Sequence, residues 1–265
     1  IDLVWFKRDL RVRDHVPLLS AALSGRPVIC LFILEPEKFD IEDTDPIHIH
    51  WELDCAIRLS ENLKKTGADL HFKIGNAIEV FEKINDNYKI ERILSHEETG
   101  NYWSYNRDKK ILKWCELNNI SWIEYPNNGV VRRLGDRDGW KKERDARMRS
   151  PLSDPPIFKE TIPYKEKIPD MADIGLNPRI LVNRPEPGEN AAIEKLQKFL
   201  QEDGINYSWA ISSPTLSVKY GSGLSPYFTV GALSMRRAVQ KTTSRINYIR
   251  KNKSQLEGHA EWIKS

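Results

Sequence analysis

The short segment from Gly221 to Ser225 is the part of the sequence best suited to bind an anion. It reads Gly-Ser-Gly-Leu-Ser, and its small side chains let a ligand approach the backbone closely. Ser222 and Ser225 add hydroxyl groups, and Pro226 suits the first turn of a helix that would begin here. Such a helix would direct its positive end toward a bound diphosphate. In isolation, the same residues also fit an ordinary glycine loop followed by a helix cap.

A second group of chemically capable residues follows the first apolar segment, Leu3 to Phe6. Arg8, Asp9, Arg11 and Asp14 bring four charges to the end of this predicted strand. We interpret them as an ion-pair network that joins the loop to the rest of the protein, because paired charges are commonly structural. Direct contact with a ligand is the alternative. No residue of the chain is assigned as a catalytic acid or base.

Short apolar segments alternate with helical patterns over the first half of the chain. Strands are predicted at Leu3–Phe6, Pro27–Leu34, Asp69–Ile74, Ile90–Ser95 and Ser121–Tyr125. Helices are predicted at His15–Leu23, Ile47–Thr66, Ala77–Ile84 and Tyr102–Asn118. Strands that are apolar on both faces and are followed by crossover helices form parallel sheets covered on both sides. The predicted fold is an α/β domain with a five-stranded parallel, doubly wound (Rossmann-like) sheet.

Ligands of such folds bind beyond the carboxyl ends of the strands. The segments Lys7–Asp14, Glu35–Pro46 and His96–Asn101 should therefore line a crevice there. Thr99 is placed to cap the helix that follows it. No GxGxxG motif comes after the first strand, which argues against a nicotinamide-dependent dehydrogenase.

The character of the sequence changes after the fifth predicted strand. Eight prolines lie between Pro151 and Pro187, as expected of an extended linker. Beyond it the apolar spacing is helical, at Glu189–Glu202, Leu224–Thr242 and Lys253–Ile263. We therefore expect an α/β domain over residues 1–130, a linker over 131–187, and the start of an all-helical domain over 188–265.

Composition narrows the class of protein. The three cysteines are far apart and form no CxxC pair, so we expect reduced core residues and neither a disulfide nor a metal site. No apolar run approaches the roughly 20 residues needed to cross a bilayer, and the first residues lack a secretory signal. We expect a cytoplasmic monomer without membrane contact. The net charge of +3 is too small to indicate or exclude nucleic-acid binding by itself.

Four segments together resemble the DNA photolyase/cryptochrome family. The opening LVWFKRDLRVRDH is similar to the family's VWFRRDLR-x-x-D start, and SHEETG and NNGVVRRL resemble family segments after the fourth and fifth strands. The segment GSGLSPY, continued by GALS, resembles the (T/G)SRLSPY-x-x-x-G-x-LS stretch with which photolyases hold the phosphates of FAD. The resemblance extends over essentially the whole chain.

The resemblance implies FAD as cofactor. Its implied contacts are Tyr207, Gly221, Ser222, Gly223, Leu224 and Ser225. Gly223 stands where the family usually has an arginine, so one positive charge is missing from this segment. A second, antenna chromophore is also implied for the α/β domain, either a folate or a deazaflavin. The acidic folate contact of some photolyases falls near Ser104, which is not acidic, and this departure argues against a folate.

The implied function is that of a deoxyribodipyrimidine photolyase, which repairs pyrimidine dimers in DNA by light-driven electron transfer from reduced FAD. Damaged DNA is the implied partner. Seven basic residues between Arg132 and Arg147 could contact its phosphates or form ion pairs within a solvated helix. A cryptochrome-type blue-light photoreceptor is the main alternative, and a module like an electron-transfer flavoprotein subunit is a third. Family members continue beyond the segment matched here, so we expect the chain alone to be inactive and to bind FAD weakly or not at all.

Overall fold

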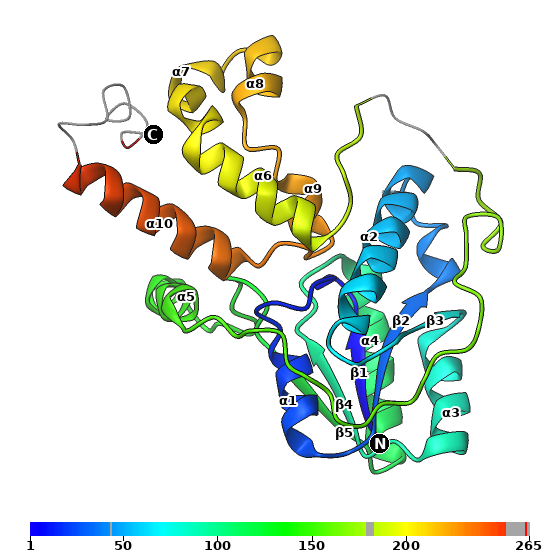
Figure 1. The fold of residues 1–265 in the computed structure, drawn as a ribbon. Helices are drawn as coiled ribbons and strands as arrows, with labels where there is room; N and C mark the ends of the chain where they lie inside the picture. The colour runs from blue at the N-terminus through cyan, green and yellow to red at the C-terminus, as the bar shows by residue number, and fades with distance from the viewer. Residues whose placement is uncertain (43, 179–182, 253–262, 264–265) are drawn as a thin grey trace.

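A parallel sheet of five strands forms the centre of the first part of the molecule (Figure 1). The structure, a computed structural model, describes residues 1–42, 44–178, 183–252 and 263. The strands are β1 (Asp2–Phe6), β2 (Val28–Leu34), β3 (Leu70–Ile74), β4 (Arg92–His96) and β5 (Ser121–Tyr125). Their order across the sheet is β3-β2-β1-β4-β5. The predicted doubly wound α/β fold and its five strands are confirmed.

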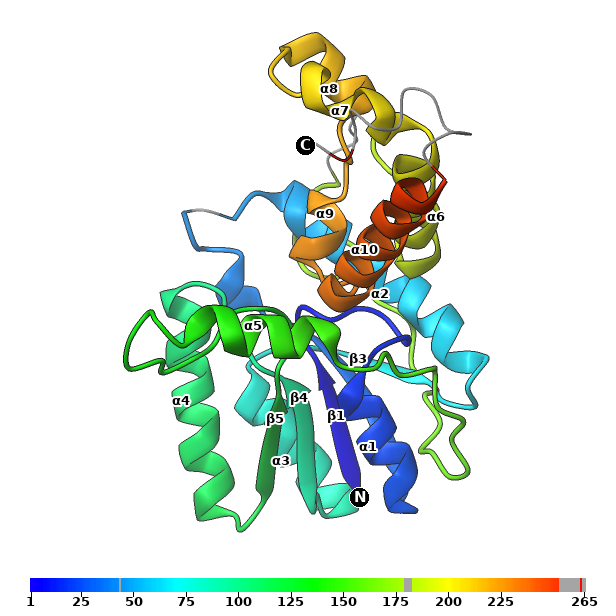
Figure 2. The ribbon, with the colours of Figure 1, turned by 90° about the vertical axis from the view of Figure 1, so that its left-hand side faces the viewer.

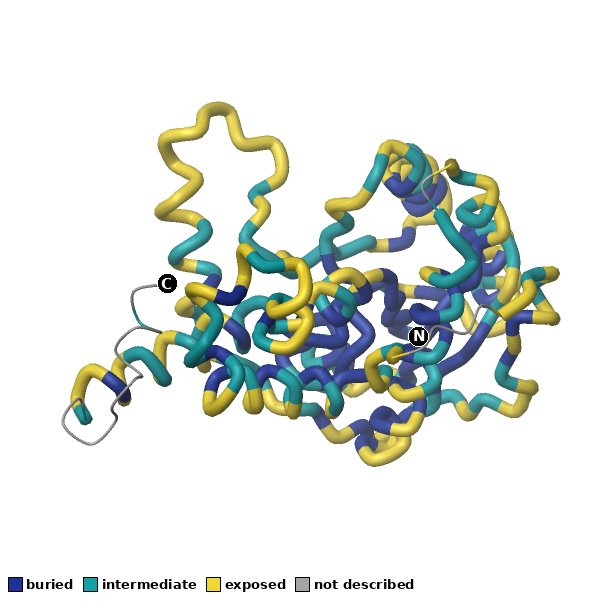
Figure 3. Tube along the Cα trace, turned by 90° about the horizontal axis from the view of Figure 1, so that it is seen from above, coloured by how far each residue is buried: buried dark blue, intermediate teal, exposed yellow. Residues whose placement is uncertain are grey.

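Alternation along β1 shows how the sequence builds a core on each face of the sheet. Val4 and Phe6 pack on one face, and Leu3 and Trp5 pack on the other. The first face is covered by α1 (Val16–Ser24) and α2 (Pro46–Lys64), and the second by α3 (Ala77–Tyr88) and α4 (Tyr102–Leu117). A short 3-10 helix, η1 (Pro36–Lys38), follows β2. Seen from above, the buried residues gather in the interior and the exposed residues lie mostly on the surrounding segments (Figure 3).

The segment after β5 contains one helix, α5 (Trp140–Arg149), and then a long stretch with little regular structure. This stretch runs back along the α/β domain. The amide of Phe158 donates to the carbonyl of Thr66 (2.9 Å), and the amide of Ile162 donates to that of Val28 (3.0 Å). The segment is therefore held against the sheet by backbone hydrogen bonds.

The described part of the chain beyond residue 187 contains helices and no strand. They are α6 (Glu189–Gln201), η2 (Asp203–Asn206), α7 (Tyr207–Ala210), α8 (Pro214–Tyr220), α9 (Ser225–Thr229) and α10 (Met235–Lys251). The single helix predicted over Leu224–Thr242 is wrong, because the chain breaks between α9 and α10. Gly231 there has a φ of +65°, and the side chain of Ser234 caps α10. The helix predicted over Lys253–Ile263 lies outside the described residues, apart from residue 263.

The helical part packs directly on the α/β domain. The indole nitrogen of Trp51 in α2 donates to the carbonyl of Pro226 in α9 (3.0 Å), and its ring lies 5.5 Å from that of Tyr227. On the other side, α10 runs beside α5 (Figure 2). One hydrophobic core includes residues from both parts. None of the described helices combines the length and apolar character needed to span a membrane.

Candidate functional site

The turn between α8 and α9, together with the first residue of α9, Ser225, contains five of the six residues expected to hold phosphate groups. The backbone amides of Ser222, Gly223, Leu224 and Ser225 donate to no protein acceptor among the described residues, and neither serine hydroxyl has a partner there. Consecutive free amides form a concave nest that suits an anion. Leu224 is buried in the core and anchors the turn.

The sixth residue, Tyr207, lies on the same side of α6 as the turn. Its ring packs edge-on against Phe199 of α6, with ring centroids 5.5 Å apart. One helical turn earlier on α6, the side chain of Lys195 lies against Gly223. Because positions four residues apart share a helix face, Tyr207 and the turn contact the same face of α6, one helical turn apart. Lys195 itself was missed from the sequence, because no motif marks it.

The helix that begins at Ser225 is shorter than the sequence indicated. It ends at Thr229, and its N-cap residue, Leu224, makes no side-chain cap. Aligned peptide dipoles add up along a helix, so a single turn contributes less positive potential than the long predicted helix would. The free amides of the turn would therefore be the main donors toward a bound anion.

A cavity of about 780 Å³ lies beyond the carboxyl ends of β1, β2 and β4. Each of the three segments predicted to line a crevice contributes to it, so that prediction is confirmed. Its aromatic lining residues are Trp5, Phe6, Phe32, Trp51 and Trp103. The cavity is also bounded by Pro226 of α9, which the sequence alone did not indicate. Its volume is within the range that holds a small organic ligand.

Two carboxylates on the cavity wall each keep one oxygen without a hydrogen bond. Oε1 of Glu35 and Oε1 of Glu98 are buried and accept no hydrogen bond, whereas Oε2 of Glu35 accepts from Arg107 (2.6 Å). Burial raises the pKa of Glu35, although Arg107 acts in the opposite direction. Burial disfavours the charge on Arg107, but Glu35, Asp108 and Glu98 outweigh it and raise the pKa of Arg107. The cavity thus combines aromatic walls with unused hydrogen-bond acceptors.

The helix beside this cavity is capped by a different residue from the one predicted. The N-cap of α4 is Asn101, whose side chain accepts from the amide of Ser104 (3.1 Å), and not Thr99. Ser104 lines the cavity, but its hydroxyl donates to the carbonyl of Asn101 (2.8 Å). Asn101 lies one residue before the helix and so has the geometry that a cap requires.

The opening loop connects the two parts of the molecule, but of the four charges predicted to form ion pairs only Asp14 makes one across this contact. Arg8 pairs with Glu98 within the α/β domain (3.8 Å), and Arg11 forms hydrogen bonds but no ion pair among the described residues. Arg11 is buried and donates to the carbonyl of Gly231 (2.9 Å). Asp14 accepts from Arg236 through both carboxylate oxygens, at 3.0 and 2.6 Å. The amides of Val12 and Arg13 donate to Glu189 at the start of α6 (3.1 and 3.0 Å). These bonds fix α6 and α10, and hence the turn, relative to the sheet.

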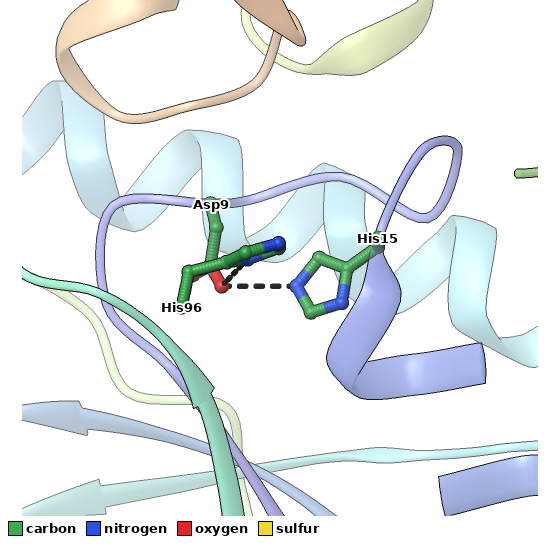
Figure 4. Close-up of side chains that lie close together, drawn as sticks. All are labelled: Asp9, His15 and His96. Atoms are coloured by element: carbon green, nitrogen blue, oxygen red, sulfur yellow. Dashed lines mark hydrogen bonds and ion pairs between the residues drawn. The ribbon is translucent and has the colours of Figure 1, made fainter. Parts of the chain in front are cut away.

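Asp9 instead joins a buried cluster with His15 and His96 (Figure 4). Its Oδ2 accepts from Nε2 of His15 (3.0 Å) and Nδ1 of His96 (2.7 Å). Nδ1 of His15 accepts from the amide of Leu18 (3.1 Å), so its proton must lie on Nε2. Of the four ring nitrogens in this cluster, only Nε2 of His96 has no hydrogen-bond partner among the described residues. One free nitrogen is too few for a metal site, and the cluster is best described as a brace for the loop.

The electrostatics of this cluster favour one anion and two neutral rings. Burial lowers the pKa of His15, and burial together with His15 lowers that of His96 to about 3. Burial alone would raise the pKa of Asp9, but the two imidazoles hold it well below its usual value. Asp9 is therefore a carboxylate at neutral pH, facing two uncharged histidines.

Of the seven basic residues around α5, some form ion pairs within the described part of the protein and the others remain free to contact a phosphate. Arg132, Arg144 and Arg147 each form an ion pair with a nearby carboxylate. Among the described residues, four others form none: Arg133, Arg137, Lys141 and Lys142. Three of the seven charges thus serve the fold, and four are available to a partner.

A parallel α/β domain joined to a helical part, with a turn of unpaired backbone amides, is an architecture suited to a nucleotide-type cofactor. The family model described as DNA photolyase matches residues 2–137. The chain belongs to the DNA photolyase/cryptochrome family and contains its amino-terminal domain with part of the helical region.

Curated relatives named cryptochrome and others named photo-lyase match the chain. A cryptochrome DASH of Gloeobacter violaceus is 26% identical over 258 residues, which cover 88% of this chain and 51% of that protein. A deoxyribodipyrimidine photo-lyase of Thermus thermophilus is 30% identical over 254 residues, which cover 92% of this chain and 54% of that protein. The chain spans about half the length of these relatives.

Two solved structures share the fold. The cryptochrome of Synechocystis has a TM-score of 0.77 at 20% identity, covering 98% of this chain and 58% of that one. The archaeal photolyase of Sulfolobus tokodaii, described with two FAD molecules, has a TM-score of 0.72 at 20% identity, covering 95% and 57%. A protein named cryptochrome and one named photolyase thus share this fold.

Proposed function

We propose that this chain supplies the antenna domain and the phosphate-binding part of the FAD site of a deoxyribodipyrimidine photolyase, which splits pyrimidine dimers in DNA under light. The observation that carries the proposal is the run of free amides from Ser222 to Ser225 in a member of this family. Such amides bind phosphate oxygens without any charged side chain. The residues of the turn therefore fit a diphosphate.

The residues of the chain bind and position the cofactor in this proposal. When bound, reduced FAD supplies the electron that light transfers to the dimer. The amides of the turn and the hydroxyls of Ser222 and Ser225 donate to the diphosphate, while Leu224 keeps the turn fixed in the core. Tyr207 of α7 packs on Phe199 of α6, one helical turn from Lys195, and its hydroxyl is a further candidate donor. No general acid or base is needed from these residues.

The cavity at the edge of the sheet is proposed to hold a second chromophore. Its aromatic walls suit a flat heterocycle, and the unused oxygens of Glu35 and Glu98 can accept from ring N–H groups. A folate, a deazaflavin or a second flavin carries such groups, and the Sulfolobus tokodaii photolyase is described with two FAD molecules. The absorption spectrum of the longest natural form would report this second band, and Glu35→Ala should remove it.

Light-dependent repair tests the proposed function. The longest natural protein containing this chain is mixed with an oligonucleotide carrying a thymine dimer, and dimer content is compared after light and after darkness. Ser225→Asp, which places a carboxylate at the diphosphate, should abolish both FAD retention and repair. Ser212→Asp adds the same charge at another exposed position and should change neither.

The cryptochrome alternative is supported by the Gloeobacter violaceus relative and gives a different result in the same assay. A photoreceptor would retain FAD and respond to light, yet leave equal amounts of dimer in light and darkness. It would also show no preference for damaged over undamaged DNA. That outcome would replace the repair function and leave the FAD site intact.

A further inference from the structure

Lys195, in the middle of α6, extends toward the turn that precedes α9. A Cβ atom at Gly223 would lie 3.0 Å from Cε of Lys195 and 3.7 Å from its Nζ. Because a Cβ is two bonds from its own amide nitrogen, Nζ lies within about 6 Å of the amide nitrogen of Gly223. One phosphate group can span this gap, since each of its oxygens accepts a bond of about 2.9 Å. The ammonium and the free amides can therefore contact the same phosphate.

The ammonium of Lys195 is only loosely engaged by protein. Its one ion-pair partner among the described residues is Asp203 of η2, at 3.8 Å, which is too long for a hydrogen bond. About a third of the lysine side chain is exposed. Ion pairs of this kind contribute little to stability. The charge thus remains available to an anion at the turn.

Gly223 leaves the space that this ammonium needs. Its φ of +60° is strained for residues other than glycine, and any side chain would press against Cε of Lys195. The turn has no cation of its own, and Lys195 extends to its Gly223. The turn and the lysine together form one site. The positive charge at the turn comes from α6, and the hydrogen-bond donors come from the turn itself.

We infer that Lys195 is the phosphate-binding cation of the turn and that Asp203 competes with the phosphate for it. The inference rests on the proposed FAD site and assigns the residue that selects a diphosphate-bearing ligand. A charge-assisted hydrogen bond contributes more than a neutral one. Loss of the lysine should therefore weaken FAD binding about 10- to 100-fold.

The experiment measures the affinities of FAD and riboflavin, which lacks phosphate, for the longest natural form freed of its flavin. Lys195→Met should weaken FAD binding by the stated factor and leave riboflavin binding unchanged, and Lys195→Arg should restore most of the FAD affinity. Lys198→Met removes the same charge from an exposed position of α6 and serves as the matched control. It should change neither affinity.

Asp203→Asn separates ligand binding from a structural role. If Asp203 competes with phosphate, its neutralisation should tighten FAD binding several-fold. If the pair only holds α6 against η2, both Asp203→Asn and Lys195→Met should weaken FAD and riboflavin binding alike, which would overturn the inference. Unchanged FAD affinity in Lys195→Met would also overturn it while leaving the proposed function standing. Failure of the wild-type protein to bind FAD would overturn both.

Discussion

Replacing His96 by asparagine should make the stability of the protein much less sensitive to mild acidification. In the folded chain His96 is buried, and its pKa is lowered to about 3 from 6.5. The unfolded chain therefore binds more protons than the folded chain below about pH 6.5, and acid favours unfolding. The pKa of His15 is lowered by burial as well, so its contribution has the same sign.

The size of the effect follows from the two pKa values of His96. At about pH 5, a histidine with a pKa of 6.5 is mostly protonated, whereas one with a pKa of about 3 is almost entirely neutral. Acidification from neutral pH to about pH 5 should therefore lower the free energy of unfolding by about 2 kcal/mol through this histidine. Asp9 adds little in this window, because a carboxylate with a lowered pKa loses stability only at lower pH.

The assay is urea unfolding of the wild type and variants at several pH values from about 7 to 5. His96→Asn should lower stability at neutral pH, because Asp9 loses part of its buried hydrogen bonding, but its free energy of unfolding should fall by about 2 kcal/mol less on acidification than that of the wild type. His48→Asn, at an exposed position, should keep the wild-type dependence. If His96→Asn and the wild type lose equal stability between these pH values, the buried neutral histidine is ruled out.

Three further predictions concern packing and reactivity. Gly231→Ala should destabilise the protein by about 2 kcal/mol or more in urea, because its Cβ would lie 2.0 Å from the carbonyl oxygen of Arg8; Gly135→Ala, with open space around it, should stay within about 0.5 kcal/mol. Asp14→Asn should cost about 3 kcal/mol, since it leaves the largely buried Arg236 without its carboxylate, and a loss under 1 kcal/mol would contradict that pairing. Burial raises the pKa of all three thiols, so a thiol reagent should label the protein only as it unfolds, and rapid labelling of the folded protein would show this to be wrong. These thiols are Cys30, Cys55 and Cys115.

The sheet could be predicted from the sequence because its signals are local. Each strand is a short apolar run, and the segments between them have helical spacing. The sequence does not define a boundary where several neighbouring residues can play the same role. Thr99 and Asn101 are both good caps, and only the backbone path decides between them. Gly231 and Ser234 carried the signals of a helix end and a helix start, but the apolar spacing across them favoured one continuous helix.

The candidate site was predictable only in part, for a physical reason. The turn at Gly221–Ser225 is a continuous stretch, so its residue types alone indicate an anion. Lys195 reaches it across a helix packing contact, and Trp51 and Pro226 close the cavity from segments far apart in the chain. Such proximities depend on how the helical part packs on the α/β domain, which no local pattern encodes.

The most direct test of the flavin assignment is an experimental structure of the longest natural form with FAD bound. We predict the diphosphate within hydrogen-bond distance of the amides of Ser222 to Ser225. A flavin held with its phosphates elsewhere, or a turn covered by other protein with no room for them, would contradict it.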